Sequence, residues 1–305
     1  MKSNQQQIDG ILLVDKPPEL TSNAVLQRVK RLFQAKKAGH TGSLDPMATG
    51  MLPICFGEAT KFCQYMLDAD KCYEATGCLG IKTTTSDAMG EVIAHNSNFS
   101  VSTEQLKNVL SRFMGSIEQV PSMYSALKHQ GVPLYKFARA GQEIERKARA
   151  ITVHTLQLTE FDGQLFKIKV NCSKGTYIRN LIEDIGEQLG VGAHVIQLHR
   201  CYTAGFEQEA MYSLEAIMGM SEDERKRCLL PMTRAIQYLP KQVLNDDEVR
   251  ALRQGKTLPH VDAMPEMGLV QLYDNQQFFI GLGEFTAAGE LKVKRLLANH
   301  QGIVN

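Results

Sequence analysis

The sequence predicts a mixed α+β fold followed by a small β-rich domain, and three observations carry this prediction. Residues 10–14 form an apolar run typical of a buried strand, and residues 166–172, FKIKVNC, alternate apolar and polar side chains as a half-buried strand does. Apolar side chains recur at helical spacing in residues 22–33 and 176–189, which indicates two amphipathic helices. From about residue 239 the pattern changes to short strand-like runs separated by turns.

The first helix is expected to begin with Ser22 as its N-cap, because a serine hydroxyl can accept a hydrogen bond from the first helical turn. Its predicted core face consists of Val25, Leu26, Val29, Leu32 and Phe33. A second helix is expected at residues 57–67 and a strand at residues 71–79.

A later helix is expected to follow the turn Ser173-Lys174-Gly175, with Thr176 as its N-cap and Gly190 at its end. Its predicted apolar stripe consists of Ile178, Leu181, Ile182, Ile185 and Leu189.

The domain boundary is placed near Pro240, which gives a large domain of residues 1–240 and a small one of residues 241–305. In the small domain, Asn245 is expected to cap a helix that ends at Gly255, before the strand-like runs.

The composition is that of an ordinary globular protein, with 43% apolar and 22% charged residues among 305. The longest apolar runs are too short for a membrane span, and residues 1–10 lack an apolar signal core. The seven cysteines form no CxxC pair, which argues against a disulfide framework or a zinc cage. Unpaired cysteines fit a reducing compartment, so we expect a cytoplasmic protein. His194 and His199 lack a metal-binding spacing.

The net charge of +1 hides two basic stretches. Residues 27–37 carry five basic side chains and no acid, and charge alone leaves open whether they follow a phosphate backbone or form a solvated helix face. In residues 124–150, basic Lys128, Lys136 and Arg139 alternate with aromatic side chains. An arm that grips folded RNA and an ordinary surface loop are the two interpretations of this segment.

Asp45 lies in a glycine-rich loop, and the proline that follows it disfavours a helical backbone there. A glycosidase needs two carboxylates and a metal site needs several ligands. General base catalysis needs a raised pKa, which a sequence does not reveal, whereas covalent catalysis needs one ionised, oriented carboxylate. Arg179, at the start of a predicted helix, is a candidate partner that would lower the pKa of Asp45. The alternative is a turn aspartate that caps local backbone amides.

Several blocks in this order resemble the TruB family of tRNA pseudouridine synthases: DKPPELTSN, GHTGSLDPMATGMLPICFGEATKF, KCYEATGCLG, PSMYSALKHQGVPLYKFARAG, CSKGTYIRNLIEDIG and GAHVIQLHR. The resemblance spans nearly all of residues 10–205, and it is weaker for the closing β-rich segment. It implies a largely antiparallel sheet with flanking helices, the pseudouridine synthase fold, and a small β-barrel-like RNA-binding (PUA-like) domain.

The resemblance also implies an activity, the conversion of the T-loop uridine at tRNA position 55 into pseudouridine without a cofactor, metal or energy donor. It implies a stand-alone enzyme of the bacterial type that acts on the tRNA T-arm, without a protein partner or a membrane, and we expect a monomer. An RNA-guided synthase and a non-catalytic tRNA chaperone are the alternative functions, and chaperone activity is compatible with catalysis.

The residue roles follow from the same resemblance. It makes Asp45 the nucleophile, Arg179 its charge partner and Tyr73 the ring that stacks on the flipped base. The substrate-binding residues that it implies, besides Tyr73, are His40, Tyr177, Leu198 and Lys16. Read without the resemblance, Tyr73 and Leu198 would be ordinary core residues.

The sequence departs from the family pattern at two places. Glu19 stands where members usually have glycine, and Thr84 stands in a run that commonly carries aspartate. Neither change involves the expected nucleophile.

Overall fold

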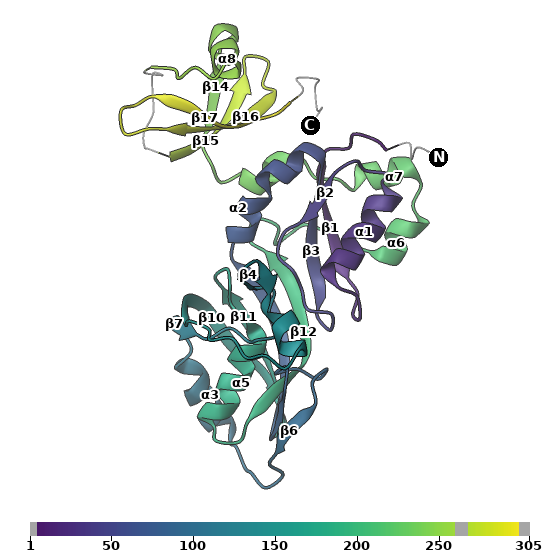
Figure 1. Cartoon of the computed structure of the whole chain (residues 1–305), viewed down its shortest axis with the longest axis vertical. Coiled ribbons are helices and arrows are strands. Elements are labelled where there is room, and N and C mark those ends of the chain that lie inside the picture. Colours follow the sequence, from purple (N-terminus) through teal and green to yellow (C-terminus); the bar gives the residue numbers. More distant parts are fainter. Residues whose placement is uncertain (1–4, 260–267, 299–305) are drawn as a thin grey trace.

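The computed structural model describes residues 5–259 and 268–298. The molecule is elongated, with a two-lobed body and a small C-terminal domain at one end (Figure 1). Of the two predicted domains, 1–240 and 241–305, residues 1–4, 260–267 and 299–305 lie outside the described chain.

A nine-stranded sheet runs through both lobes of the body. In spatial order its strands are β13 (Tyr212–Ser213), β1 (Gly10–Lys16), β3 (Thr49–Phe56), β12 (Ala193–Thr203), β4 (Lys71–Leu79), β11 (Leu165–Cys172), β10 (Arg149–Phe161) and β7 (Gly115–Gln119), with β2 (Ala38–His40) paired to β3. Only the pairs β13–β1 and β12–β3 are parallel among these described strands. The predicted α+β class with a largely antiparallel sheet is therefore confirmed.

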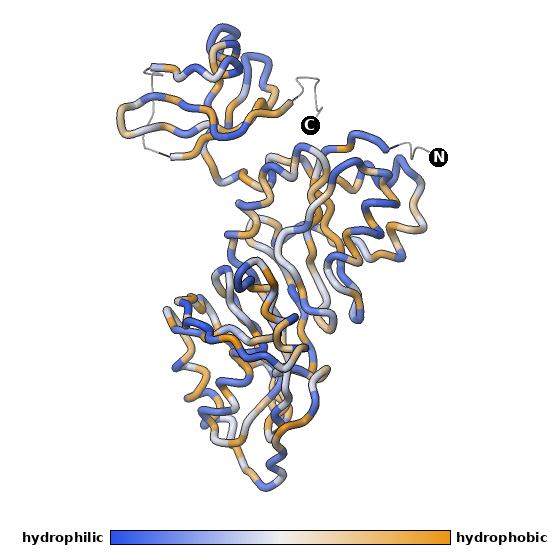
Figure 2. Tube along the Cα trace, viewed as in Figure 1, coloured by the Kyte–Doolittle hydropathy of each residue, from blue (hydrophilic) through white to orange (hydrophobic). Residues whose placement is uncertain are grey.

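Helices cover both faces of the lobe that contains β1 and β3 (Figure 1). They are α1 (Ser22–Leu32), α2 (Cys63–Asp68), α6 (Leu214–Gly219), α7 (Glu222–Arg227) and the 3₁₀ helices η1 (Gly57–Phe62) and η2 (Met232–Ile236). Val14 packs with the apolar faces of α1 and α6, whereas its neighbour Leu13 packs with α2 and η2. Alternation along a strand thus fills two cores, and the outer helix α7 stays hydrophilic (Figure 2).

In the other lobe, α3 (Thr103–Ser111) and α5 (Ile178–Gln188) cover one face of the sheet. Ala75 of β4 and Ile168 of β11 pack with Leu110 of α3 and Ile182 of α5. The opposite face carries polar side chains, among them an ion pair of 3.7 Å between Lys169 Nζ and Glu74 Oε1. Side chains of β4 on the covered face therefore share one layer with α5.

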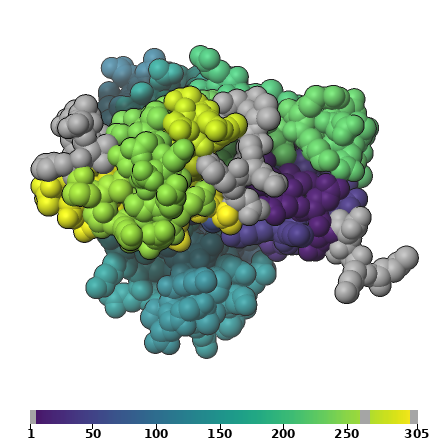
Figure 3. Space-filling model, turned by 90° about the horizontal axis from the view of Figure 1, so that it is seen from above, coloured from purple at the N-terminus to yellow at the C-terminus, as the bar shows by residue number. Residues whose placement is uncertain are grey.

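Two short hairpins extend from this lobe. They are β5 (Ile81–Thr83) with β6 (Val92–His95), and β8 (Lys128–His129) with β9 (Val132–Pro133), the latter followed by α4 (Leu134–Arg139). The second hairpin and α4 lie within residues 124–150, called the arm from here on. Figure 3 shows the arm, in teal, projecting from one side of the body.

Both predicted N-caps of the body helices are wrong. Thr21 caps α1, because its hydroxyl accepts a hydrogen bond of 3.1 Å from Ala24 N. Ser22 is buried and instead bonds both backbone groups of Leu44. The Thr176 hydroxyl donates to Ser173 O, and Tyr177 occupies the N-cap position of α5. In both cases a tertiary or turn acceptor competes with the helix end for the hydroxyl.

The C-terminal domain is a four-stranded sheet with one helix. Its elements are β14 (Lys241–Leu244), α8 (Asp246–Arg253), β15 (Gly268–Asp274), β16 (Phe279–Phe285) and β17 (Leu291–Leu296). Asn245 caps α8 as expected, with its side chain accepting from Asp247 N and Glu248 N. The domain contacts η1 of the body through Lys61 Nζ, which donates to Leu296 O at 2.8 Å, and Glu58 Oε2, which accepts from Ala298 N at 2.7 Å.

Candidate active site

The loop that carries Asp45 is fixed to the body by buried hydrogen bonds. The Ser22 hydroxyl accepts from Leu44 N at 2.8 Å and donates to Leu44 O at 3.1 Å. Ala48 N closes a turn on Asp45 O at 3.1 Å. The backbone on both sides of Asp45 is therefore held, and its side chain has a set direction.

Lys16 lies under this loop and is fully buried. Its ammonium donates to three carbonyls, those of Pro17, Pro46 and Ala48, at 2.8, 3.1 and 2.6 Å. Burial lowers the pKa of Lys16 to about 8, against the favourable charge of Asp45. Lys16 thus ties the loop to β1 from inside the protein, and its ammonium has no exposed surface to offer a substrate.

Arg200 of β12 holds the two ends of the same loop. It is 1% exposed, its Nε donates to Met51 O at 2.6 Å, and its Nη2 donates to Gly42 O at 3.1 Å. Gly50 allows this approach, because it adopts φ +97° and a Cβ there would lie 2.2 Å from Arg200 O. The sequence analysis did not single out Arg200, since an arginine in a strand pattern reads as a surface residue.

The structure brings Asp45 and Arg179 together across 134 positions of sequence. Arg179 Nε lies 2.8 Å from Asp45 Oδ2, and Nη2 donates to Oδ1 at 3.2 Å. The Arg179 side chain is 4% exposed and that of Asp45 is 35% exposed. The guanidinium is therefore buried behind the carboxylate, which keeps an accessible side for a reacting group.

Burial raises the pKa of Asp45 above its ordinary value of 3.8. Arg179 lowers it, as the sequence analysis expected, and Lys16 does the same, but the charge of Asp87 adds to the rise. The net shift is upward because desolvation outweighs the cations. Reactivity that needs an ionised Asp45 should accordingly be lost as the pH falls through this raised pKa.

Asp87 is a second carboxylate on Arg179 that sequence reasoning missed. Its Oδ2 lies 3.4 Å from Arg179 Nη1, and its side chain is 6% exposed. The hydroxyl of Thr85 and the amide of Met89 hold its Oδ1 at 2.5 and 3.0 Å. The sequence singles out residues 83–87 only for a departure from the family pattern, and nothing in this run indicates that Asp87 lies beside Arg179.

Tyr73 lies opposite Arg200 in the antiparallel pair of β4 and β12. The ring is half-buried against the apolar cluster that contains Leu44, Ala48 and Leu198, and the charge of Asp45 acts on the pKa of its phenol, so Tyr73 lies near the Asp45 loop. Burial raises the pKa of Tyr73, against the charge of Arg200 and a hydrogen bond with it, so the phenol stays protonated at neutral pH.

The other predicted substrate-binding residues lie around this group. Tyr177 is half-buried at the N-cap position of α5, and burial raises the pKa of its hydroxyl. Leu198 is 7% exposed in the same apolar cluster as Tyr73. His40 lies in β2, and burial followed by the charge of Arg200 lowers its pKa, so the ring is neutral at pH 7. Its Nδ1 is buried without a hydrogen-bond partner among the described residues.

The arm residues Lys128, Lys136 and Arg139 are exposed. Arg139 stacks over the ring of Tyr135, with its Cζ 5.4 Å from the ring centroid. The base of the arm reaches the site, because Tyr124 O accepts from Arg179 Nη2 at 3.0 Å.

The backbone conformation at Glu19 shows why glycine suits this position in the family pattern. This residue adopts φ +65°, a left-handed conformation that glycine takes without steric cost. The Thr84 hydroxyl accepts from Glu91 N at 3.2 Å within the β5–β6 connection.

Metal-binding clusters of three or more ligand residues are absent from residues 5–259 and 268–298. His194 Nδ1 and His199 Nδ1 instead lie 3.0 and 2.8 Å from Ile81 O and the Thr49 hydroxyl. All seven cysteines are free thiols. Within the described chain, we find no helix with the length and apolar character of a membrane span.

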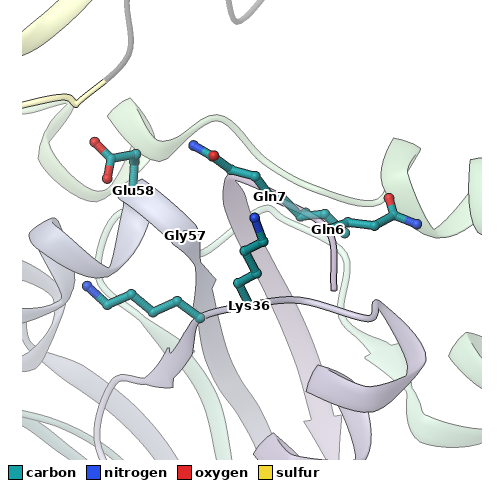
Figure 4. Close-up of a pocket in the computed structure, with 7 residues that line it drawn as sticks. Gln6, Gln7, Lys36, Gly57 and Glu58 are labelled. Carbon is teal, nitrogen blue, oxygen red and sulfur yellow. The ribbon is translucent and has the colours of Figure 1, made fainter. Parts of the chain in front are cut away.

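A separate small pocket lies where the N-terminal segment, the residues just before β2 and the start of η1 meet. Its lining residues are Gln6, Gln7, Ile8, Lys36, Lys37, Gly57 and Glu58. Figure 4 shows the polar side chains around it. This lining contains none of the predicted site residues.

The chain matches three family models in succession. The first, described as TruB family pseudouridylate synthase (N terminal domain), matches residues 30–178. The second, tRNA pseudouridylate synthase B C-terminal domain, matches residues 179–237, and the third, Pseudouridine synthase II TruB, C-terminal, matches residues 240–297.

Curated relatives and solved structures agree with these matches. The tRNA pseudouridine synthase B of Legionella pneumophila (strain Paris) is 55% identical over 295 residues and 97% of each chain, and that of Methylobacillus flagellatus is 48% identical over 296 residues and 97% of each chain. A crystal structure of a Cbf5-Nop10-Gar1 complex has a TM-score of 0.72 at 27% identity, over 94% of this chain and 84% of that one. A structure of an H/ACA RNP bound to a substrate RNA containing 2′-deoxyuridine has a TM-score of 0.71 at 26% identity, over 95% and 85%. The chain belongs to the TruB family of pseudouridylate synthases.

Proposed function

We propose that this protein isomerises a uridine of tRNA to pseudouridine, with Asp45 as the nucleophile. The observation that carries the proposal is a partly exposed carboxylate whose two oxygens face a buried guanidinium, beside the ring of Tyr73. The curated relatives are named tRNA pseudouridine synthase B, which supports tRNA as the substrate class.

In this reaction the N1–C1′ bond of uridine breaks and a C5–C1′ bond forms. The proton lost from C5 is balanced by one gained at N1, so the formula is unchanged. Because the atoms balance within the nucleotide, we propose that no cofactor or metal takes part. Asp45 attacks either the ribose C1′ or the pyrimidine ring and leaves again after the base has turned, which makes it a covalent catalyst in both routes.

A uridine in a folded arm must leave its stack before Asp45 can reach it, at a cost of a few kcal/mol. Stacking on Tyr73 offsets this cost by about 1–3 kcal/mol. Arg179 orients Asp45 and opposes the rise of its pKa, while Leu198 belongs to the apolar cluster against which Tyr73 packs. Lys16 does not contact the substrate, and it fixes the Asp45 loop through the backbone carbonyls to which it donates.

The substrate that we propose is the T-arm, with the uridine at position 55, held by the arm through Lys128, Lys136 and Arg139. His40 and Tyr177 would line the site of the flipped base. We propose a cytoplasmic monomer that works without guide RNA or protein partner. Chaperone activity toward tRNA would use the same arm but not Asp45.

The test is incubation of the purified full chain with an unmodified T-arm minihelix, followed by mapping of pseudouridine in the product. The proposal requires pseudouridine at the T-loop uridine without added guide RNA or metal. Binding of the minihelix without any pseudouridine would leave the chaperone function instead, and modification only with a guide RNA would favour the RNA-guided alternative.

A further inference from the structure

The arm is attached to the body at the same helical turn that carries Arg179. The edge strand β7 ends at Gln119, and the chain then runs to Tyr124, where the arm begins. Two side chains of α5 bond this stretch: Asn180 Nδ2 donates to Val120 O at 3.1 Å, and Arg179 Nη2 donates to Tyr124 O at 3.0 Å. Force on the arm therefore reaches the first turn of α5.

Gln119, the last residue of β7, makes two hydrogen bonds to the start of α5. Its Oε1 accepts from Tyr177 N at 2.8 Å, and its Nε2 donates to Tyr177 O at 3.0 Å. The side chain is 3% exposed, so water cannot replace these bonds without local opening. One side chain thus bonds both backbone groups of the residue at the N-cap position of α5.

This contact differs from an ordinary N-cap, whose side chain accepts from the second or third helical N–H, because Gln119 bonds the backbone of the N-cap residue itself. The Thr176 hydroxyl is engaged with Ser173 O, and Gln119 supplies the acceptor for Tyr177 N. Tyr177 O also accepts from Leu181 N at 3.0 Å within the helix. Gln119 therefore fixes the rotation of the first turn of α5, from which Arg179 reaches Asp45.

We propose that Gln119 is a positioning residue for the isomerisation, which holds Arg179 on Asp45 while the arm carries RNA. It acts through Tyr177 and the first turn of α5 and does not touch the substrate. The inference rests on the proposed function for its catalytic consequence. The clamp itself, meaning the two bonds between Gln119 and Tyr177, can be tested without any activity.

The chemistry of an amide suggests the decisive variant, Gln119→Glu. A protonated carboxylic acid accepts from Tyr177 N and donates to Tyr177 O, so it reproduces both bonds, whereas a carboxylate faces the carbonyl without a proton. Burial and the facing carbonyl raise the pKa of the introduced acid. The variant should therefore regain activity as the pH falls, a signature that a pH-independent loss of stability would not give.

The experiment measures single-turnover pseudouridine formation in the T-arm minihelix from pH 5.5 to 8.5, as the ratio of variant to wild type. For Gln119→Glu we expect a ratio lowered about tenfold at pH 8.5 and restored to within about threefold at pH 5.5. Gln119→Leu cannot form either bond, so its ratio should be at least about tenfold low at every pH and should not recover as the pH falls. Gln157→Glu, the same change at an exposed position of β10, should give a flat ratio near one.

Hydrogen exchange at the amide of Tyr177 provides the second readout, because this amide donates to Gln119. Exchange should be at least about tenfold faster in Gln119→Leu than in wild type. Unchanged exchange in both Gln119 variants would overturn the clamp, and faster exchange with a flat, wild-type rate ratio would overturn its role in positioning Arg179. If wild type makes no pseudouridine, the proposed function fails, while the exchange measurement still decides the clamp.

Discussion

Replacement of Arg179 by lysine should slow isomerisation strongly while keeping a positive charge at the site. The guanidinium contacts both Asp45 oxygens and donates to Thr85 O and Tyr124 O at 3.0 Å each. Lysine has one compact ammonium on a flexible stem and cannot keep this fork of contacts.

The expected magnitude follows from the bonds lost at Asp45. A hydrogen bond to a charged group contributes about 1.5–3 kcal/mol, so losing one or two costs about 1.5–6 kcal/mol. At about 1.4 kcal/mol per tenfold, the single-turnover rate should fall by roughly 10- to 10⁴-fold. The acid limb of the rate profile should also move to higher pH, because Arg179 opposes the rise in the pKa of Asp45.

The assay is release of tritium from C5 of a labelled T-arm minihelix, since this hydrogen is lost when the C5–C1′ bond forms. The matched control is Arg234→Lys, a partly exposed arginine paired with Glu209 at 2.5 Å in the other lobe. A rate for Arg179→Lys within threefold of wild type, with the acid limb unmoved, would refute the reasoning about the pair.

Three further predictions concern the groups around this pair. Asp87→Asn should lower the pKa of Asp45 and shift the acid limb of the rate to lower pH, because the charge of Asp87 raises that pKa; an unmoved limb would contradict this. Burial lowers the pKa of Lys16 from 10.5 to about 8, so between these pH values the unfolded chain binds more protons at Lys16 than the folded protein does. The free energy of unfolding should therefore rise as the pH increases from about 8 to 10.5. Denaturant titrations should show this gain in wild type and not in Lys16→Met, and equal slopes would count against it. Glu19→Gly should raise the free energy of unfolding by up to about 1 kcal/mol, because it relieves a left-handed backbone, and a lower midpoint in urea would disprove the strain.

The parts of the fold that follow from local pattern were predictable from the sequence. Residues 71–79 form β4 with the expected limits, and residues 166–172 fall in β11, because alternation on a half-buried sheet leaves a clear period. Residues 57–67 are helical but divide into η1 and α2. The caps at Ser22 and Thr176 could not be predicted, since the competing acceptors, Leu44 O and Ser173 O, depend on tertiary and turn geometry.

In the site, too, some features were predictable from the sequence and others depend on tertiary geometry. A resemblance in motif order identified Asp45 and Arg179, and the fold does bring them into contact. The sequence offered no means of seeing that Arg179 serves two carboxylates, because Asp87 enters from the β5–β6 connection. The net pKa of Asp45 also depends on burial, which spacing does not reveal, and it moved opposite to the expected effect of the arginine.

The most direct test of the account replaces Asp45 by asparagine, which keeps the size of the side chain and one acceptor oxygen but removes the nucleophilic charge. The measurement is pseudouridine in unmodified tRNA transcript after prolonged incubation with the variant, alongside the affinity of the variant for the same RNA. The account predicts RNA binding close to wild type and no pseudouridine. Measurable pseudouridine from Asp45→Asn would contradict the assignment of the nucleophile.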